Sequence, residues 1–253
     1  MPVIKLNNRE VHIQELNKEG RETVVLIHGM FSNLSVYYFN IAPILAEYYH
    51  VVMYDLKSHG LSEKVPNGYD LESMTDDLLL LLNALELPQV HLAGYSFGGL
   101  IALKMACRFP EMIKKLVVIE APDPNDDRTR DIIESYNKEF LENYVTNFTD
   151  TTKVKMGKRQ LERNHRMYEY LFHETSIKTD MVLESDFFLD KGIGEVPHHT
   201  LLLYGENSNC VNAGRNLRKI IGRSRLLELS GDHNIPIQEP ETVGKMMEMF
   251  FKK

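Results

Sequence analysis

The stretch HLAGYSFGGLIALKM, residues 91–105, places one serine between glycines where an apolar run gives way to a helical pattern. Residues 89–93 are mostly apolar and follow Pro88, which predicts a short strand buried on both faces. Residues 97–109 carry apolar side chains at helical spacing, which predicts a helix. Ser96 therefore lies in the turn between a strand and a helix.

The glycines around Ser96 indicate why a reactive side chain stands there. Gly94 and Gly98 lie two residues before and two after the serine, and glycine lets backbone segments approach closely and tolerates strained dihedrals. This is the G-x-S-x-G pattern in the strand–turn–helix context that presents a serine as a nucleophile. A glycine-rich turn that carries a serine by chance is the alternative, but the flanking elements favour the nucleophile.

The composition is that of a globular protein. The chain has 253 residues, of which 43% are hydrophobic and 26% charged, enough to bury a large core. The net charge of -7 argues against nucleic-acid binding, which needs clustered positive charge. The start is charged and lacks the apolar segment of a signal peptide, and no later stretch is long and apolar enough to span a bilayer. We therefore expect a cytoplasmic protein with no membrane partner.

The two cysteines, Cys107 and Cys210, are too few for a disulfide framework. Neither lies at a spacing typical of a metal site. We therefore expect no metal and no cofactor.

Strand and helix patterns alternate along most of the chain. Residues 3–6 and 11–16 predict a hairpin around Asn7 and Asn8, and the C-terminal segment predicts a helix with Val243, Met247 and Phe250 on one face. Further predicted strands are 23–27, 51–54, 115–119, 200–204 and 225–229, and further predicted helices are 36–48 and 71–85. This alternation predicts an α/β protein with a mostly parallel central sheet flanked by helices.

No strand pattern interrupts the long segment between the strands 115–119 and 200–204. It carries helical stripes instead, which predicts a helical cap at 123–196, inserted into a core formed by 1–122 and 197–253. Plain packing is the usual role of such stripes, but some aromatic side chains are expected to face the active edge of the core. The residues assigned to this substrate pocket are Tyr95, Tyr136, Phe140, Tyr168 and Phe172.

Four motifs in a fixed order resemble those of the α/β-hydrolase superfamily. They are LIHGM (26–30), DLKSHGLS (55–62), AGYSFGG (93–99) and GDHNIPIQEP (231–240). The resemblance covers nearly the whole core and implies the α/β-hydrolase fold. One departure is Ser58, which stands where the family often has glycine; we interpret that segment as a structural turn in which Asp55 and His59 are not catalytic.

A serine hydroxyl is a poor nucleophile without a base, and the base needs a third group to hold it. The resemblance implies that His233, after the last strand, is this base. The family usually places the acid where this chain has Ser208, which cannot carry a charge. A second placement known in the superfamily implies Glu120, because a carboxylate at the end of a buried strand needs a partner. Glu206 and an acid from elsewhere, or none, remain alternatives.

The expected oxyanion donors are the backbone N–H groups of Met30 and Phe97. The leading hypothesis is a serine hydrolase of the carboxylesterase or thioesterase type, which cleaves a carboxylic ester or thioester through an acyl-enzyme. One alternative is a ligand-binding receptor on the same scaffold with little turnover. Another is a C–C bond hydrolase or a cofactor-independent oxygenase.

The expected partner is a small-molecule acyl substrate. Residues 123–142 carry a net charge of -4, with seven acids and three bases, whereas residues 153–166 carry +5, with six bases and one acid. A basic cap segment on an acidic protein would suit an acidic acyl-carrier protein or the phosphates of coenzyme A. The favoured alternative is that the two segments pair with each other or are solvated.

Overall fold

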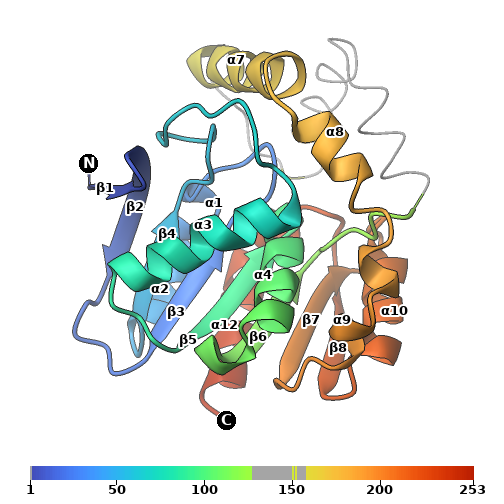
Figure 1. The fold of residues 1–253 in the computed structure, drawn as a ribbon. Coiled ribbons are helices and arrows are strands. Elements are labelled where there is room, and N and C mark those ends of the chain that lie inside the picture. The colour runs from blue at the N-terminus through green and yellow to red at the C-terminus, as the bar shows by residue number, and fades with distance from the viewer. Residues whose placement is uncertain (1, 127–149, 151, 153–157) are drawn as a thin grey trace.

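The computed structural model describes residues 2–126, 150, 152 and 158–253. A sheet of eight strands runs through this part of the chain (Figure 1). The strands are β1 (Val3–Leu6), β2 (Arg9–Leu16), β3 (Thr23–Ile27), β4 (His50–Tyr54), β5 (Val90–Tyr95), β6 (Ile113–Ile119), β7 (Thr200–Gly205) and β8 (Ser224–Leu229).

The strand order is β1-β2-β4-β3-β5-β6-β7-β8. The first two strands form the predicted antiparallel hairpin, and β2 is also antiparallel to β4. Asn7 and Asn8 form its turn with φ angles of 47° and 66°, a backbone conformation that asparagine adopts more readily than most residues. All other pairs are parallel. The fold class predicted from the sequence is confirmed.

Helices cover both faces of the sheet, and Figure 1 shows α3 and α4 in front of it and α12 behind it. The front layer contains α3 (Leu71–Ala84), α4 (Phe97–Arg108) and α10 (Val211–Ile220). The back layer contains α1 (Ser35–Tyr38), α2 (Ile41–Ala46) and α12 (Pro240–Phe251). Every residue of β3, β4, β5 and β7 is buried between these layers, which is why these strands have long apolar runs without polar alternation.

Two helices differ from the prediction. The single helix expected at 36–48 is divided into α1 and α2, because Pro43 lacks an N–H group and its ring would clash with the carbonyl of Phe39 in a continuous helix. The helix α10 was not predicted. Its amphipathic pattern is clear, but the segment is polar on average and its buried residues are Ala213, Gly214 and Leu217, of which two are small.

The described part of the segment between β6 and β7 is helical. It contains α7 (Lys158–His173), α8 (Ile177–Val182), the 3-10 helix η2 (Phe187–Leu189) and α9 (Lys191–Gly194). The 3-10 helix η1 (Pro110–Met112) precedes β6, and the short helix α11 (Ile235–Gln238) precedes α12. The division of the chain into a core and a cap at 123–196 stays a prediction. In the described residues, no helix has both the length and the apolarity that crossing a bilayer requires.

Candidate active site

Ser96 lies at the sharp turn between β5 and α4. Its backbone dihedrals are φ 54° and ψ -120°, outside the helical and extended regions that its neighbours adopt. A Cβ on Gly98 would lie 2.4 Å from the carbonyl oxygen of Ile27, and a Cβ on Gly94 would lie 2.0 Å from that of Gly98. Both glycines are therefore required by the close approach of β3, β5 and α4, which holds the serine at the carboxyl end of the sheet.

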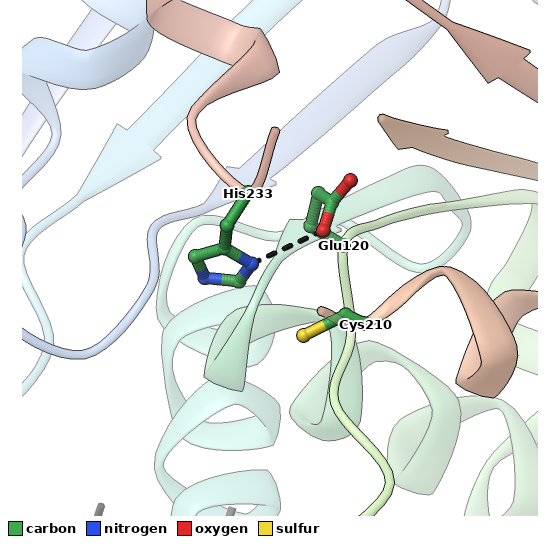
Figure 2. Close-up of side chains that lie close together, drawn as sticks. All are labelled: Glu120, Cys210 and His233. Carbon is green, nitrogen blue, oxygen red and sulfur yellow. Dashed lines mark hydrogen bonds and ion pairs between the residues drawn. The ribbon is translucent and has the colours of Figure 1, made fainter. Parts of the chain in front are cut away.

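The structure brings Ser96, His233 and Glu120 together from three distant segments. The Nε2 atom of His233 lies 3.1 Å from the Oγ of Ser96. The Nδ1 atom of the same ring lies 3.1 Å from Oε2 of Glu120 (Figure 2). His233 comes from the loop between β8 and α11, and Glu120 directly follows β6. The imidazole therefore contacts the serine hydroxyl through one ring nitrogen and the carboxylate through the other, as in a catalytic triad.

Glu120 is completely buried and is held by several donors. Its φ of 56° turns the chain sharply at the end of β6. Besides the His233 ring, the carboxylate accepts hydrogen bonds from the backbone N–H of Gly205 and from the hydroxyl of Ser208. Because each carboxylate oxygen has a donor from β7 or the turn after it, the charge is stabilised despite its burial.

The role of Ser208 was missed in the sequence. Its hydroxyl accepts from the backbone N–H of Cys210 at 3.0 Å and donates to Glu120, so it orients the carboxylate from the position where the family usually has an acid. A polar residue at that position was the available signal. Because a hydroxyl carries no charge, this signal by itself does not predict a contact with the acid.

The other acids near His233 are placed differently. Glu206 is exposed, and its backbone N–H extends the pairing with Leu229. The Oδ1 atom of Asp232 accepts from the backbone N–H of Asn234 at 2.8 Å, which fixes the turn that carries the histidine. In the described residues, Glu120 is therefore the carboxylate that contacts Nδ1 of His233.

Neighbouring groups shift the pKa of the His233 ring. Burial opposes the charge on the ring, but the nearby Cys210 sulfur and the Glu120 carboxylate outweigh it, so the pKa of His233 lies above its ordinary value. The Tyr95 hydroxyl donates to the backbone carbonyl of His233 at 3.0 Å, and the two rings lie 5.4 Å apart. Tyr95, expected in the pocket, thus also supports the histidine loop.

The predicted oxyanion donors lie on both sides of Ser96. Phe97 is the first residue of α4, where backbone N–H groups lack partners within the helix. Gly29 packs so closely on the nucleophile that a Cβ there would lie 2.9 Å from Cβ of Ser96. Met30 follows this glycine, so the oxyanion role of Met30 and Phe97 remains a proposal with compatible backbone placement.

His28 precedes Gly29 and Met30, and its fully buried ring supports the turn that they form. Its Nε2 accepts from the backbone N–H of Leu56 at 2.9 Å, so its Nδ1 carries the hydrogen and donates to the carbonyl of Gly29 at 2.7 Å. Burial lowers the pKa of His28. The ring is therefore a neutral part of the framework.

The segment DLKSHGLS forms a structural turn away from the triad. Asp55 accepts from the backbone N–H groups of Leu34 and Leu61 at 2.8 and 2.9 Å. Ser58 has a φ of 63°, which explains why the family often has glycine there. The Nδ1 of His59 donates to the backbone carbonyl of Lys57 at 2.8 Å, and burial lowers the pKa of His59 to about 3.

The remaining aromatic residues assigned to the pocket divide into two groups. Tyr168 and Phe172 of α7 are buried and pack on Phe31, with ring centroids 4.6 and 5.3 Å from it. The Tyr168 hydroxyl also donates to the Phe31 carbonyl at 3.3 Å. These contacts place α7 on the loop after β3, beside Met30. Tyr136 and Phe140 lie outside the described residues, so a pocket role for all of them stays a prediction.

The charged cap segments are described only in part. Much of 123–142 and 153–166 lies outside the described residues. Arg159, Arg163 and Arg166 of α7 are described and exposed.

A family comparison identifies the chain. The family described as alpha/beta hydrolase fold matches residues 22–158, more than half of the chain. The chain belongs to the α/β-hydrolase family. This agrees with the motifs that carry the resemblance and with the observed sheet order.

Individual relatives of this α/β-hydrolase extend the comparison. The chain is 27% identical to "Putative carbamate hydrolase RutD" of Agrobacterium fabrum over 87% of its own length and 88% of the relative. It is 38% identical to the RutD of Pantoea ananatis, but over 43% of the chain and 40% of that relative. Several curated relatives are matched over only 33% to 50% of their length.

A solved structure supports the fold independently. A meta-cleavage product hydrolase from Pseudomonas fluorescens superposes with a TM-score of 0.79 and 20% identity, over 100% of this chain and 97% of that one. At this identity the likeness extends to the fold alone.

Proposed function

We propose that this α/β-hydrolase is a serine hydrolase that cleaves a carboxylic ester or thioester through an acyl-enzyme. The observation that carries the proposal is the continuous pair of contacts from Ser96 Oγ to His233 Nε2 and from His233 Nδ1 to Glu120, each 3.1 Å long. Membership of a hydrolase family supports the same class of chemistry.

The first half of the proposed reaction forms the acyl-enzyme. The Oγ of Ser96 attacks the carbonyl carbon while its proton passes to Nε2 of His233. The negative charge on the carbonyl oxygen is stabilised by the N–H groups of Met30 and Phe97, and the imidazolium by the Glu120 carboxylate. The proton on Nε2 then passes to the departing alcohol or thiol as its bond to the carbonyl carbon breaks.

The second half restores the enzyme. Water gives a proton to Nε2 of His233 and its oxygen attacks the acyl carbon. The bond to Ser96 breaks, and the serine takes the proton back. Hence the cycle consumes one water and leaves the three residues unchanged.

The leaving group and the acyl group are open in this proposal. The exposed arginines of α7 would suit an acyl-carrier protein or coenzyme A, which favours including thioesters among the candidates. The names of the RutD relatives favour including carbamates as well. We therefore propose a panel of short p-nitrophenyl esters, acyl-coenzyme A thioesters and aryl carbamates.

The experiment combines covalent labelling with turnover. A fluorophosphonate probe is expected to label Ser96, and at least one class of the panel to be hydrolysed, with both lost in Ser96→Ala. Ser35→Ala, which changes an exposed serine at the start of α1, is the matched control and is expected to retain both. A folded protein that takes no label would contradict the proposal. Labelling without turnover across the panel would favour a ligand-binding receptor or C–C bond chemistry instead.

A further inference from the structure

Cys210 is a second chemically reactive group at the triad, and the proposed reaction does not use it. It precedes α10, is 9% exposed and forms no disulfide. Its Sγ, a ring nitrogen of His233 and a carboxylate oxygen of Glu120 all lie within 4.8 Å of one another. Figure 2 shows the three side chains converging on a common space from three different segments.

We propose that Glu120, Cys210 and His233 form a Zn²⁺-binding site whose occupation switches off the triad. Thiolate, imidazole and carboxylate are the three ligand types that Zn²⁺ takes in proteins. Two protein ligands on one tetrahedral zinc lie roughly 3.3–3.8 Å apart, because each bond is about 2.0–2.3 Å long. The observed separations therefore require side-chain movements of only about 1 Å.

Charge and access fit a divalent ion. One carboxylate and one thiolate balance the two positive charges of zinc, so the occupied site carries no net charge. The side chain of His233 is 29% exposed, which gives the ion a route from solvent and leaves room for water as a fourth ligand. The backbone N–H of Cys210 already donates to Ser208, which also holds Glu120, so two of the ligands share one support.

Zinc on Nδ1 would change the tautomer of the imidazole. When the ring is neutral and Nδ1 carries the hydrogen that it shares with Glu120, Nε2 can accept the proton of Ser96. When zinc takes the Nδ1 lone pair, the thiol proton is released and the ring proton moves to Nε2. The ring then presents N–H to Ser96 and cannot act as its base.

The binding step depends on the geometry alone, whereas its inhibitory effect rests on the proposed function. The two are therefore tested separately. Binding is measured on Ser96→Ala, which retains all three ligands, by titration with Cd²⁺ and detection of the ultraviolet charge-transfer band of a cadmium–thiolate bond. The band is expected in Ser96→Ala and in Ser96→Ala/Cys107→Ser, and is expected to be lost in Ser96→Ala/Cys210→Ser.

Inhibition is measured on the active enzyme with whichever substrate it hydrolyses. Zn²⁺ is expected to lower kcat reversibly, with recovery on chelation, and Mg²⁺ to have no effect because it prefers oxygen ligands. Cys210→Ser is expected to raise the Zn²⁺ concentration for half-inhibition at least tenfold, with Cys210→Ala as a second variant, whereas Cys107→Ser matches the wild type. A folded protein without the cadmium band, or inhibition that survives loss of Cys210, would overturn the proposal. A cadmium band in a protein that hydrolyses no substrate of the panel would support the site and contradict the proposed cleavage of esters or thioesters.

Discussion

Glu120 shows how a single residue decides the chemistry of this site. Its carboxylate contacts His233 Nδ1 at 3.1 Å and is fully buried, so its charge acts on the ring with little screening by solvent. The same burial would be unfavourable without the donors from Gly205 and Ser208. The charged form of Glu120 therefore depends on its hydrogen bonds from Gly205 and Ser208.

Substitution of this acid tests its role. Glu120→Gln keeps the shape of the side chain but removes the charge that stabilises the imidazolium. If the proposed function holds, we expect kcat to fall by about 10⁴-fold, as for the corresponding acid-to-amide change in a serine protease triad. Glu206→Gln, at the exposed alternative position, is expected to leave kcat within about twofold of the wild type. An equal fall of kcat in the two variants would contradict the assignment of Glu120 as the acid of the triad.

Some residues of the candidate site can be predicted from the sequence and others cannot. Ser96 follows from the glycines around it and the elements that flank it, and His233 from its place after the last strand. Ser208 and Cys210 do not follow in this way, because their contacts with Glu120 and His233 depend on how the turn after β7 folds back toward β6. No local pattern encodes that approach.

At the scale of elements, the turn from β5 to α4 is the most constrained part of the fold. Gly94 and Gly98 each occupy a place where a side chain would meet backbone atoms, and backbone cannot move aside as a side chain can. Strand β3 is held against this turn from one side. The position of the nucleophile is therefore coupled to the stability of the central sheet.

Adding a methyl group at residue 98 tests the coupling between the turn and the stability of the sheet. In Gly98→Ala the new Cβ would lie 2.4 Å from the carbonyl oxygen of Ile27, so the turn must distort. We expect the free energy of unfolding in urea to fall by about 1–3 kcal/mol. Gly222→Ala is the control, since a Cβ there meets nothing within 4 Å. Similar stabilities for the two variants would show that the turn is looser than its contacts indicate.

The elements themselves are largely predictable because the buried strands have unbroken apolar runs and the long helices have clear stripes. The two errors have local causes. Pro43 interrupts a helix whose apolar pattern continues across it. The segment of α10 is amphipathic, but it is polar on average and buries two small residues, so it lacks the apolar content by which the other helices were predicted. Sheet order did not follow from the pattern, since it depends on which strands pair across the fold.

At the scale of the whole molecule, the described helices of the predicted cap pack on the rest of the chain through partly buried polar contacts as well as aromatic ones. Asp180 of α8 accepts from the backbone N–H of Tyr69 at 2.8 Å, and Glu184 accepts from that of Leu71 at 2.7 Å. Both carboxylates lie at the start of α3, where the helix dipole favours negative charge. They connect the segment around α8 to the front layer of the core.

Removal of both carboxylates is expected to loosen this connection. Asp180→Ala/Glu184→Ala removes the hydrogen bonds from the backbone N–H groups of Tyr69 and Leu71, and also the one from the Ser176 hydroxyl to Asp180. The loss of one such bond to a charged group costs about 1.5 kcal/mol or more. We expect trypsin to cleave after Lys178 about tenfold faster under native conditions, because local opening becomes more frequent. Asp186→Ala, which changes an exposed acid of the same segment, serves as the control. Unchanged cleavage in the double variant would mean that the aromatic contacts of α7 suffice to dock the cap.

The placement of the acid on β6 has a consequence for how this protein can be modified. Tyr95 and Ile119 are paired neighbours in the sheet, so serine and acid are supplied by adjoining strands. The tip of the turn that follows β7, where Glu206 and Asn207 are exposed, carries no reacting group. A fluorophore attached through the exposed side chain of residue 206 would stand close to the site, while the backbone contacts of this turn with Leu229 and Gly231 stay in place.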